Sequence, residues 1–241
     1  MTFEAYWNEL LQQDEIKSSE SLLSKIAKQL DKGTTKHSRR TAVGVAMATY
    51  LGSVEHDLAT PLVAAAHVHD LGKHACQEII TASYVDFRQP FNKHKQRRHP
   101  HDGFVIVKRH VQHTALSDLA ATHVLTHHTH KNAEDSNYPT PAILSLYVDV
   151  GDITQRHLDV ARQTGPILAH SDLIDAMSHP AERPYMASDE VLMSMTYPEL
   201  VDNAVRVANR DISLMPFGIA PQHIGAMLVA HQTLVDAYSA P

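Results

Sequence analysis

The chain has little cysteine and no long apolar run, and each shortage excludes a class of protein. Its 241 residues include one cysteine, Cys76, which excludes an intrachain disulfide framework and a cysteine-based zinc finger. No apolar run approaches the roughly 18 residues of a membrane span. The N-terminal residues have neither a basic start nor an apolar signal core. We therefore expect no membrane contact and a location in the reducing cytoplasm.

Positive charge is also scarce. The chain has 21 Lys and Arg against 27 Asp and Glu, a formal net charge of −6, and a pI near 6.3. Binding to DNA or RNA depends on basic side chains that neutralise phosphates, so the composition argues against a nucleic-acid partner. The length fits one large domain, whose core is sufficient to fold without a disulfide or a structural metal.

Histidine, in contrast, is abundant, with 19 residues against 9 glycines. It is the commonest metal ligand and the side chain that titrates nearest to physiological pH. The placement of the histidines along the chain therefore decides which of them are candidates for chemistry.

The apolar pattern predicts an all-α protein. Apolar residues recur at helical spacing over residues 3–30, with Gly33 as a stop signal, and an apolar run after Thr60-Pro61 predicts a buried helix that begins there. No segment shows the sustained alternation typical of a strand. Further helices are expected over residues 36–51, 103–112, 115–128, 165–178, 189–196, 198–211 and 221–238. Residues 129–141 and 180–188 are expected to be loops, and residues 142–150 are ambiguous between helix and strand.

The strongest local motif is His69-Asp70-Leu71-Gly72-Lys73, directly after the apolar run. A His and an Asp side by side at the end of a buried helix are costly unless they are paired or bind a metal. Both can reach one centre where the chain turns away at Gly72, and the two oxygens of Asp70 can bridge two cations. Lys73 supplies a point charge that suits a phosphate. A second pair, His56-Asp57, lies in a polar stretch without the Gly-Lys, so we interpret it as a solvated loop.

Further candidate ligands lie in or directly after segments that should pack. Each is more often structural when taken alone, but together they form an ordered set. The set consists of His37 near a helix start, His99 before Pro100, the pair His127-His128 at a helix end, and Asp172 in an apolar segment.

In this order the motifs resemble the HD superfamily of metal-dependent phosphohydrolases and, within it, the HD-GYP branch. The similarity covers about residues 36–186 and includes His37, the HDxGK motif at 69–73, His99 four residues before Gly103, His127-His128, Asp172-Leu-Ile-Asp175 and Arg183-Pro184-Tyr185. It implies an HD-domain helical bundle over residues 36–188. A helical extension over residues 1–35 would precede this bundle, and C-terminal helices over residues 189–241 would pack on it.

The resemblance also implies a binuclear site. It would hold two divalent transition-metal ions, with Fe or Mn favoured and Ni, Co or Zn as alternatives. The ligands of one ion would be His37, His69, Asp70 and Asp172, and those of the other His99, His127 and His128, with Asp70 as the bridge. Asp70 and Lys73 are the implied catalytic residues. Substrate would be bound by Lys73, Arg183 and Tyr138.

Two departures from the HD-GYP pattern bear on substrate and metal number. The loop over residues 127–139 lacks the Glu and both glycines of the family motif and carries two additional residues, although Asp135, Tyr138 and Pro139 remain. In some relatives a Glu one turn before the first His holds a third metal. Gly33 stands at that place here, so two ions are expected rather than three.

Several neighbouring residues are rival or supporting groups. His123 lies four residues before His127, a spacing that can itself form a ligand pair, and Asp149 and Asp152 rival Asp172. The family order favours His128 and Asp172. Among the remaining residues, Asp175 is expected to support a ligand or cap a helix rather than bind metal, and His67 is expected to pack behind the site. His101, His110, His113 and His130 are expected at the surface, with His130 able to reach the site mouth.

The sequence therefore predicts a phosphodiesterase in which two metals activate a water that hydrolyses a nucleotide such as cyclic di-GMP. Two alternatives stay open. The altered loop motivates a catalytically weak module that binds a nucleotide or a signalling partner, and the same scaffold also supports a di-iron oxygenase. The expected partner is a phosphate-containing small molecule, a nucleotide; a homodimer or a signalling partner is also considered.

Overall fold

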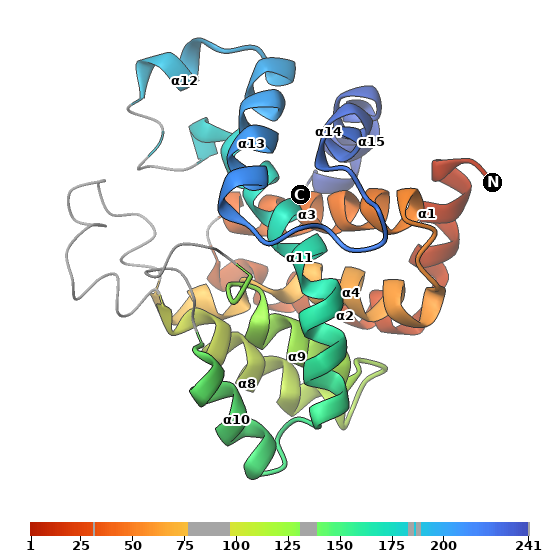
Figure 1. Cartoon of the computed structure of the whole chain (residues 1–241), viewed down its shortest axis with the longest axis vertical. Helices are drawn as coiled ribbons and strands as arrows, with labels where there is room; N and C mark the ends of the chain where they lie inside the picture. The colour runs from red at the N-terminus through yellow and green to blue at the C-terminus, as the bar shows by residue number, and fades with distance from the viewer. Residues whose placement is uncertain (31, 77–96, 131–138, 183–185, 187–188, 241) are drawn as a thin grey trace.

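The computed structural model describes residues 1–30, 32–76, 97–130, 139–182, 186 and 189–240. Every regular element in these ranges is a helix, which confirms the predicted all-α class (Figure 1). The α-helices are α1 (Phe3–Gln12), α2 (Asp14–Ile26), α3 (Lys32–Leu51), α4 (His56–Val68), α8 (His99–Val111), α9 (Asp118–Thr126), α10 (Pro141–Asp149), α11 (Gln155–Ser178), α12 (Glu190–Ser194), α13 (Tyr197–Asp211), α14 (Pro221–Ala230) and α15 (Gln232–Ser239). The short 3-10 helices are η1 (Ala27–Gln29), η2 (Leu71–Cys76) and η4 (Pro180–Glu182).

Helices α3, α4, α9 and α11 form the centre of the bundle. Helix α4 packs against α2, α3 and α9, and α11 packs against α3, α9 and α13. The apolar run of the sequence explains this position, because every residue from Leu62 to Val68 is buried. Residues 40–49 of α3 are likewise all buried. Helices that are buried on all faces belong in the interior of a domain, so the predicted buried helix is confirmed.

The helices at both ends of the chain cover this centre. Phe3, Tyr6 and Trp7 of α1 are buried, and α1 packs on α2 and α3. Helices α14 and α15 pack against α3 on the same side as the C-terminus (Figure 1). Arg39 of α3 donates from Nη1 to the carbonyl of Ala240 over 2.8 Å. The bundle thus has helical extensions at both termini, whereas the expected domain boundaries after residues 35 and 188 stay predictions.

Two of the predicted helix boundaries were wrong at the start of the central helices α3 and α4. Gly33 lies inside α3, and Thr60-Pro61 lies inside α4, which begins at His56. The amides of Leu58 and Ala59 donate to the Glu55 carbonyl and start the helix there. His56-Asp57 is therefore the first helical turn and not a loop. A carboxylate in that turn is favourable because the helix N-terminus carries partial positive charge.

Helix α11 begins at Gln155, ahead of the expected residue 165. The side-chain oxygen of Thr154 accepts from the amide of His157 at 3.1 Å and caps the helix. Pro166 lies in the helix interior, where it removes one turn hydrogen bond. The helix start expected at residue 165 was therefore ten residues too late. Helix α10 also resolves the ambiguous segment 142–150 as helix, and the expected helix over 221–238 is divided into α14 and α15.

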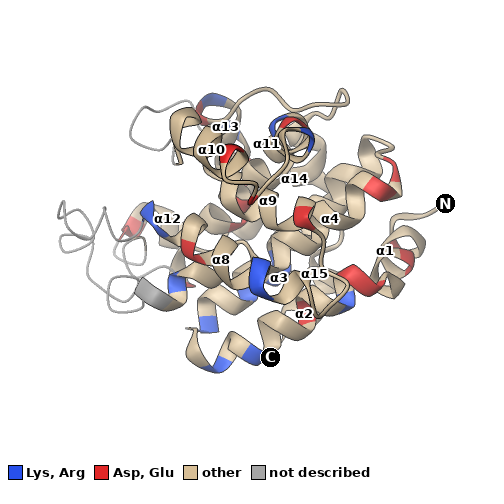
Figure 2. Cartoon of the chain, turned by 90° about the horizontal axis from the view of Figure 1, so that it is seen from below, with Lys and Arg blue, Asp and Glu red and all other residues tan. Residues whose placement is uncertain are grey.

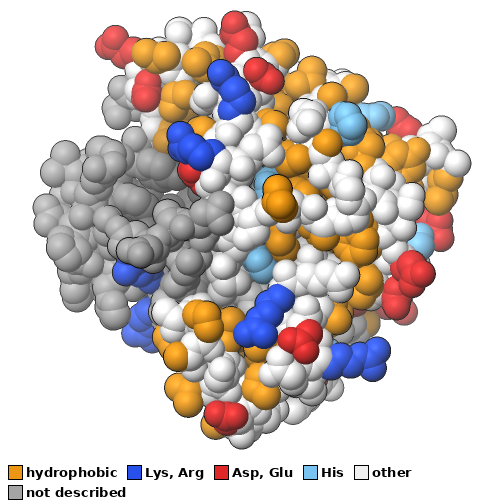
Figure 3. Space-filling view, in the orientation of Figure 1, with side chains coloured by type: hydrophobic (Ala, Val, Ile, Leu, Met, Phe, Trp, Pro, Cys, Tyr) orange, Lys and Arg blue, Asp and Glu red, His pale blue; other side chains and the backbone are white. Residues whose placement is uncertain are grey.

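Charge and histidine are distributed unevenly over the molecule. Acidic side chains gather on α1 and the first turn of α2 (Figure 2). On the face in Figure 3, the histidines that reach the surface are scattered rather than grouped. The histidines that lie together are buried, except His128, which is partly exposed. Within the described ranges, no helix has both the length and the apolarity needed to cross a membrane.

Candidate metal centre

The HDxGK segment brings the end of α4 against the start of α8. Helix α4 ends at Val68, so His69 and Asp70 occupy the turn into η2, which packs on α8. A Cβ on Gly72 would lie 1.9 Å from the carbonyl oxygen of His99, closer than any side chain permits. Glycine is therefore required at residue 72, because the backbone of α8 approaches it directly. This contact places His99 beside the His-Asp pair.

The first cluster consists of His37 from α3, His69 and Asp70 from the end of α4, and Asp172 from α11. His37, His69 and Asp70 each offer one ligand atom, and these atoms lie within 4.8 Å of one another. The Nε2 atoms of His37 and His69 both lie 3.5 Å from Asp70 Oδ2. Asp172 Oδ1 lies 2.9 Å from His37 Nε2 and 3.6 Å from His69 Nε2. Four side chains from three helices thus face one point.

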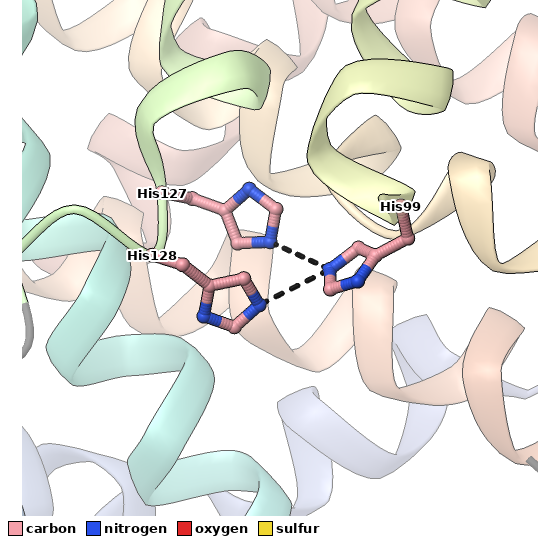
Figure 4. Close-up of side chains that lie close together, drawn as sticks. All are labelled: His99, His127 and His128. Atoms are coloured by element: carbon pink, nitrogen blue, oxygen red, sulfur yellow. Dashed lines mark hydrogen bonds between the residues drawn. The ribbon is translucent and has the colours of Figure 1, made fainter. Parts of the chain in front are cut away.

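The second cluster consists of His99 from α8 and His127 and His128 from the end of α9. The Nε2 of His99 lies 3.1 Å from the Nε2 of His127 and 3.1 Å from that of His128 (Figure 4). His99 and His127 are buried, and His128 is partly exposed. Three imidazole nitrogens that point at one another cannot all be satisfied by hydrogen bonds among themselves, because each neutral ring carries only one N–H.

Asp70 lies between the two clusters. Its Oδ2 faces His37 and His69, and its Oδ1 lies 3.4 Å from His99 Nε2. Lys73, one turn further along, donates from Nζ to Asp70 Oδ2. The carboxylate therefore has one oxygen directed at each group of nitrogens and a primary ammonium beside it.

The hydrogen bonds of the rings fit metal ligation through Nε2. His69 donates from Nδ1 to the Ala66 carbonyl at 2.8 Å, and His127 donates from Nδ1 to the Val124 carbonyl at 2.6 Å. Backbone acceptors of this kind fix the tautomer that leaves the Nε2 lone pair for a metal. The Nε2 of His69 is buried and makes no hydrogen bond to any described residue. Imidazole and carboxylate donors without thiolate suit Fe, Mn, Co, Ni or Zn.

The electrostatics of the first cluster favour a bound positive charge. Burial opposes ionisation of Asp70, but Lys73 and then His69, His99 and His37 hold its pKa well below the ordinary value. Burial likewise opposes ionisation of Asp172, whose pKa is held well below the ordinary value by His37 and His69. Both carboxylates are therefore anionic at neutral pH.

The two histidines at the centre respond to this charge in opposite ways. Burial alone would lower the pKa of His69, yet Asp70 and then Asp172 raise it above the ordinary value. Burial, followed by the neighbouring His99 and His69, holds the pKa of His127 well below the ordinary value. The imidazole of His127 is thus neutral, so its Nε2 can bind a metal ion. The surroundings of His69 attract a cation, either a proton or a metal ion.

The structure brings together all seven residues expected to bind metal, and the rivals lie elsewhere. Asp149 and Asp152 are exposed. His123 Nε2 meets the hydroxyl of Thr164 at 3.2 Å and belongs to neither cluster. Tyr138 and Arg183, the expected substrate-binding residues besides Lys73, lie outside the described residues.

The structure contradicts the predicted surface position of His130, whereas the contacts of His67 and Asp175 agree with their expected roles. His130, expected at the surface, is 7% exposed, and a Cβ on Gly165 would lie 2.1 Å from its Nε2. His67 is fully buried between Ser19 and Tyr238, as expected for a packed residue. Asp175 Oδ2 accepts from His37 Nδ1 at 2.7 Å. Burial opposes ionisation of Asp175, but Arg40 holds its pKa well below the ordinary value.

Comparisons with known proteins identify the fold. No family model and no curated protein matches the chain. Among solved structures, the HD domain of the L. monocytogenes phosphodiesterase PgpH in complex with cyclic-di-AMP is similar, with a TM-score of 0.54 and 18% identity over 87% of this chain and 96% of that one. The chain has the HD-domain fold. A second structure of the PgpH HD domain gives a TM-score of 0.52 and 16% identity over 88% and 98% of the two chains.

The HD-domain fold that the sequence resemblance implies is thus confirmed. The His-Asp clusters lie where α3, the end of α4, α8, α9 and α11 meet, and their donor atoms are consistent with divalent metal binding. The narrower similarity to the HD-GYP branch stays a prediction.

Proposed function

We propose that the chain is a metal-dependent phosphohydrolase, specifically a phosphodiesterase that acts on a nucleotide. One observation carries the proposal. The carboxylate of Asp70 has one oxygen toward His37 and His69, the other toward His99, and the ammonium of Lys73 beside it. A bridging carboxylate between two nitrogen-rich sites is the arrangement that a pair of catalytic cations needs.

Each residue has a role in this proposal. His37, His69 and Asp172 would complete one metal site with Asp70, and His99, His127 and His128 the other. Cations bound there would supply Lewis-acid polarisation of a phosphate and a water of lowered pKa. Lys73 would bind a phosphate oxygen and stabilise the negative charge that develops on it. Arg183 and Tyr138 are proposed as further substrate contacts.

The charges of the site and the comparisons support a proposal for the substrate class. A site with two cations and a lysine selects a phosphate group, and phosphate esters are bonds whose spontaneous hydrolysis is very slow. The PgpH HD domain was solved with cyclic-di-AMP bound, and the HD-GYP resemblance points to cyclic di-GMP. We therefore propose a cyclic dinucleotide as the substrate class.

The decisive experiment measures metal content and phosphodiesterase activity on the same preparation. We expect about two equivalents of a transition metal by elemental analysis and metal-dependent hydrolysis of bis(p-nitrophenyl) phosphate. Asp70→Asn should lose bound metal and activity, and Lys73→Gln should keep the metal but lose activity on the order of 100-fold. Asp149→Asn and Lys17→Gln, which change exposed residues of the same type, are the matched controls and should behave as wild type.

A panel of cyclic-di-AMP, cyclic-di-GMP and linear dinucleotides then tests the substrate class separately from metal-dependent hydrolysis. Hydrolysis of the chromogenic ester without cleavage of any nucleotide would contradict the substrate class alone. Nucleotide binding without turnover by metal-loaded protein would favour the signalling module. Oxygen consumption by iron-loaded protein with a phosphonate would favour the oxygenase. Absence of bound metal under all these conditions would contradict the whole proposal.

A further inference from the structure

Arg40 is a buried cation whose position the metal centre alone does not explain. It lies on α3 three residues after His37, and only 4% of its surface is exposed. A buried guanidinium is tolerated only where its N–H groups are satisfied and its charge is balanced. Its partners therefore indicate why the sequence places an arginine there.

Arg40 is held by two carboxylates from different elements. Its Nε donates to Asp175 Oδ1 at 2.6 Å and its Nη2 to Asp175 Oδ2 at 3.2 Å. Nη2 also donates to Glu182 Oε2 at 2.7 Å. The planar fork of the guanidinium thus clamps Asp175 on α11 and, at the same time, Glu182 at the end of η4.

The clamped carboxylate in turn contacts the first metal cluster. Asp175 Oδ2 accepts from His37 Nδ1 at 2.7 Å, and the opposite nitrogen, Nε2, faces Asp70 and Asp172. A hydrogen bond from Nδ1 to a carboxylate fixes both the tautomer and the rotation of a ligating imidazole. The chain of contacts therefore runs from Glu182 through Arg40 and Asp175 to the ring of His37.

We propose that Arg40 is a positioning residue for the metal centre, which holds Asp175 so that His37 presents Nε2 to the first cluster. Glu182 anchors Arg40 from the far side and extends this support to the end of η4. The inference rests on the proposed function, since it assigns His37 as a metal ligand. It predicts that arginine is required for its two-sided geometry, because lysine offers one point charge instead of a fork.

A matched control separates positioning from general stabilisation. Arg39, the neighbour of Arg40 on α3, also makes a two-point contact with a carboxylate, from Nε and Nη2 to Glu20 at 3.1 and 2.7 Å. Its Nη1 donates to the carbonyl of Ala240, and neither Glu20 nor Ala240 belongs to either cluster. Removing Arg39 therefore costs an ion pair of the same kind without touching His37.

The test compares Arg40→Met, Arg40→Lys, Asp175→Asn and Arg39→Met by calorimetric titration with Mn²⁺ and by the visible spectrum of Co²⁺-loaded protein. We expect Arg40→Met and Asp175→Asn to weaken one class of Mn²⁺ site about 10- to 100-fold and to change the Co²⁺ spectrum. Arg40→Lys should give a smaller loss, and Arg39→Met should match wild type. In ¹⁵N-histidine-labelled protein, the protected Nδ1–H signal of His37 should disappear in Asp175→Asn.

The outcomes distinguish this inference from the proposed function. If wild-type protein binds no Mn²⁺, the proposed function fails. If wild type binds Mn²⁺ and Arg40→Met binds it equally well, or loses no more affinity than Arg39→Met, only the positioning role is overturned. Should Arg40→Met fail to fold, Asp175→Asn and Arg40→Lys decide the matter by the same two measurements.

Discussion

Replacing Gly72 with alanine tests whether the contact between η2 and α8 assembles the two clusters. The added Cβ would lie 1.9 Å from the carbonyl oxygen of His99 and 2.6 Å from the amide nitrogen of Gly103. Both are backbone atoms, and Cβ atoms essentially never approach another atom within 3.0 Å. The His99 carbonyl would therefore have to withdraw by at least about 1.1 Å, the difference between 1.9 and 3.0 Å.

That displacement acts directly on the site. His99 Nε2 lies 3.4 Å from Asp70 Oδ1 and 3.1 Å from both His127 and His128. Functional geometry tolerates displacements of roughly 0.5 Å, and a misplacement near 1 Å costs on the order of 100-fold in rate. We expect Gly72→Ala to reduce hydrolysis of bis(p-nitrophenyl) phosphate by about that factor. The overpacking should also lower the free energy of unfolding by about 1–3 kcal/mol.

The assay pairs Mn²⁺ titration and turnover with urea denaturation. Gly225→Ala is the control, because its Cβ would meet side-chain methyls of Val205 at 2.9 Å and Val201 at 3.1 Å, between α13 and α14. It should cost stability and leave Mn²⁺ affinity intact. If Gly72→Ala folds, binds Mn²⁺ and turns over as wild type does, the close backbone approach does not hold the two clusters together.

Two further predictions concern the buried histidines. Burial lowers the pKa of His67 and His130 to about 4 and that of His123 to about 3. Between these pKa values and about pH 6.5, the unfolded chain binds more protons than the folded one. As the pH falls from 6.5 to 5, the free energy of unfolding should therefore decrease by up to about 1.4 kcal/mol per histidine and pH unit. Urea denaturation measures this free energy, and a value that does not change with pH would contradict the prediction. Tyr238→Phe removes the 2.8 Å bond to His67 Nε2 and should cost about 1–3 kcal/mol by thermal unfolding. The control is Tyr50→Phe, because the Tyr50 hydroxyl donates to the exposed Met1 carbonyl and its removal should cost little stability. If both variants lose the same stability, the buried hydrogen bond to His67 contributes no more than an exposed one.

The helical class of the fold could be predicted because the apolar positions recur at helical spacing along most of the chain. The helix boundaries were predicted less accurately, because a single residue such as proline is compatible with more than one position in a helix. Pro61 and Pro166 are typical of helix starts, but in this fold both lie inside helices whose packing outweighs the lost hydrogen bond. The first helical turn of α4 therefore looked like a polar loop.

More of the candidate site could be predicted from the sequence than of the contacts that surround it. His69, Asp70, Gly72 and Lys73 lie within five consecutive residues, and together with the other ordered candidates this spacing predicts shared chemistry. The Arg40–Asp175 pair joins residues 135 positions apart, and nothing in the local pattern of α3 connects them. The burial of His130 depends in the same way on the close approach of Gly165 from α11. Contacts of this kind arise from tertiary packing and have no local signature.

A crystal structure of Mn²⁺-loaded protein, with anomalous data collected at the manganese edge, would show directly whether the two clusters bind metal. We predict two anomalous peaks, one among His37, His69 and Asp172 and one among His99, His127 and His128, with Asp70 contacting both. Strong anomalous peaks elsewhere, or none in a crystal whose protein carries bound manganese, would contradict this prediction.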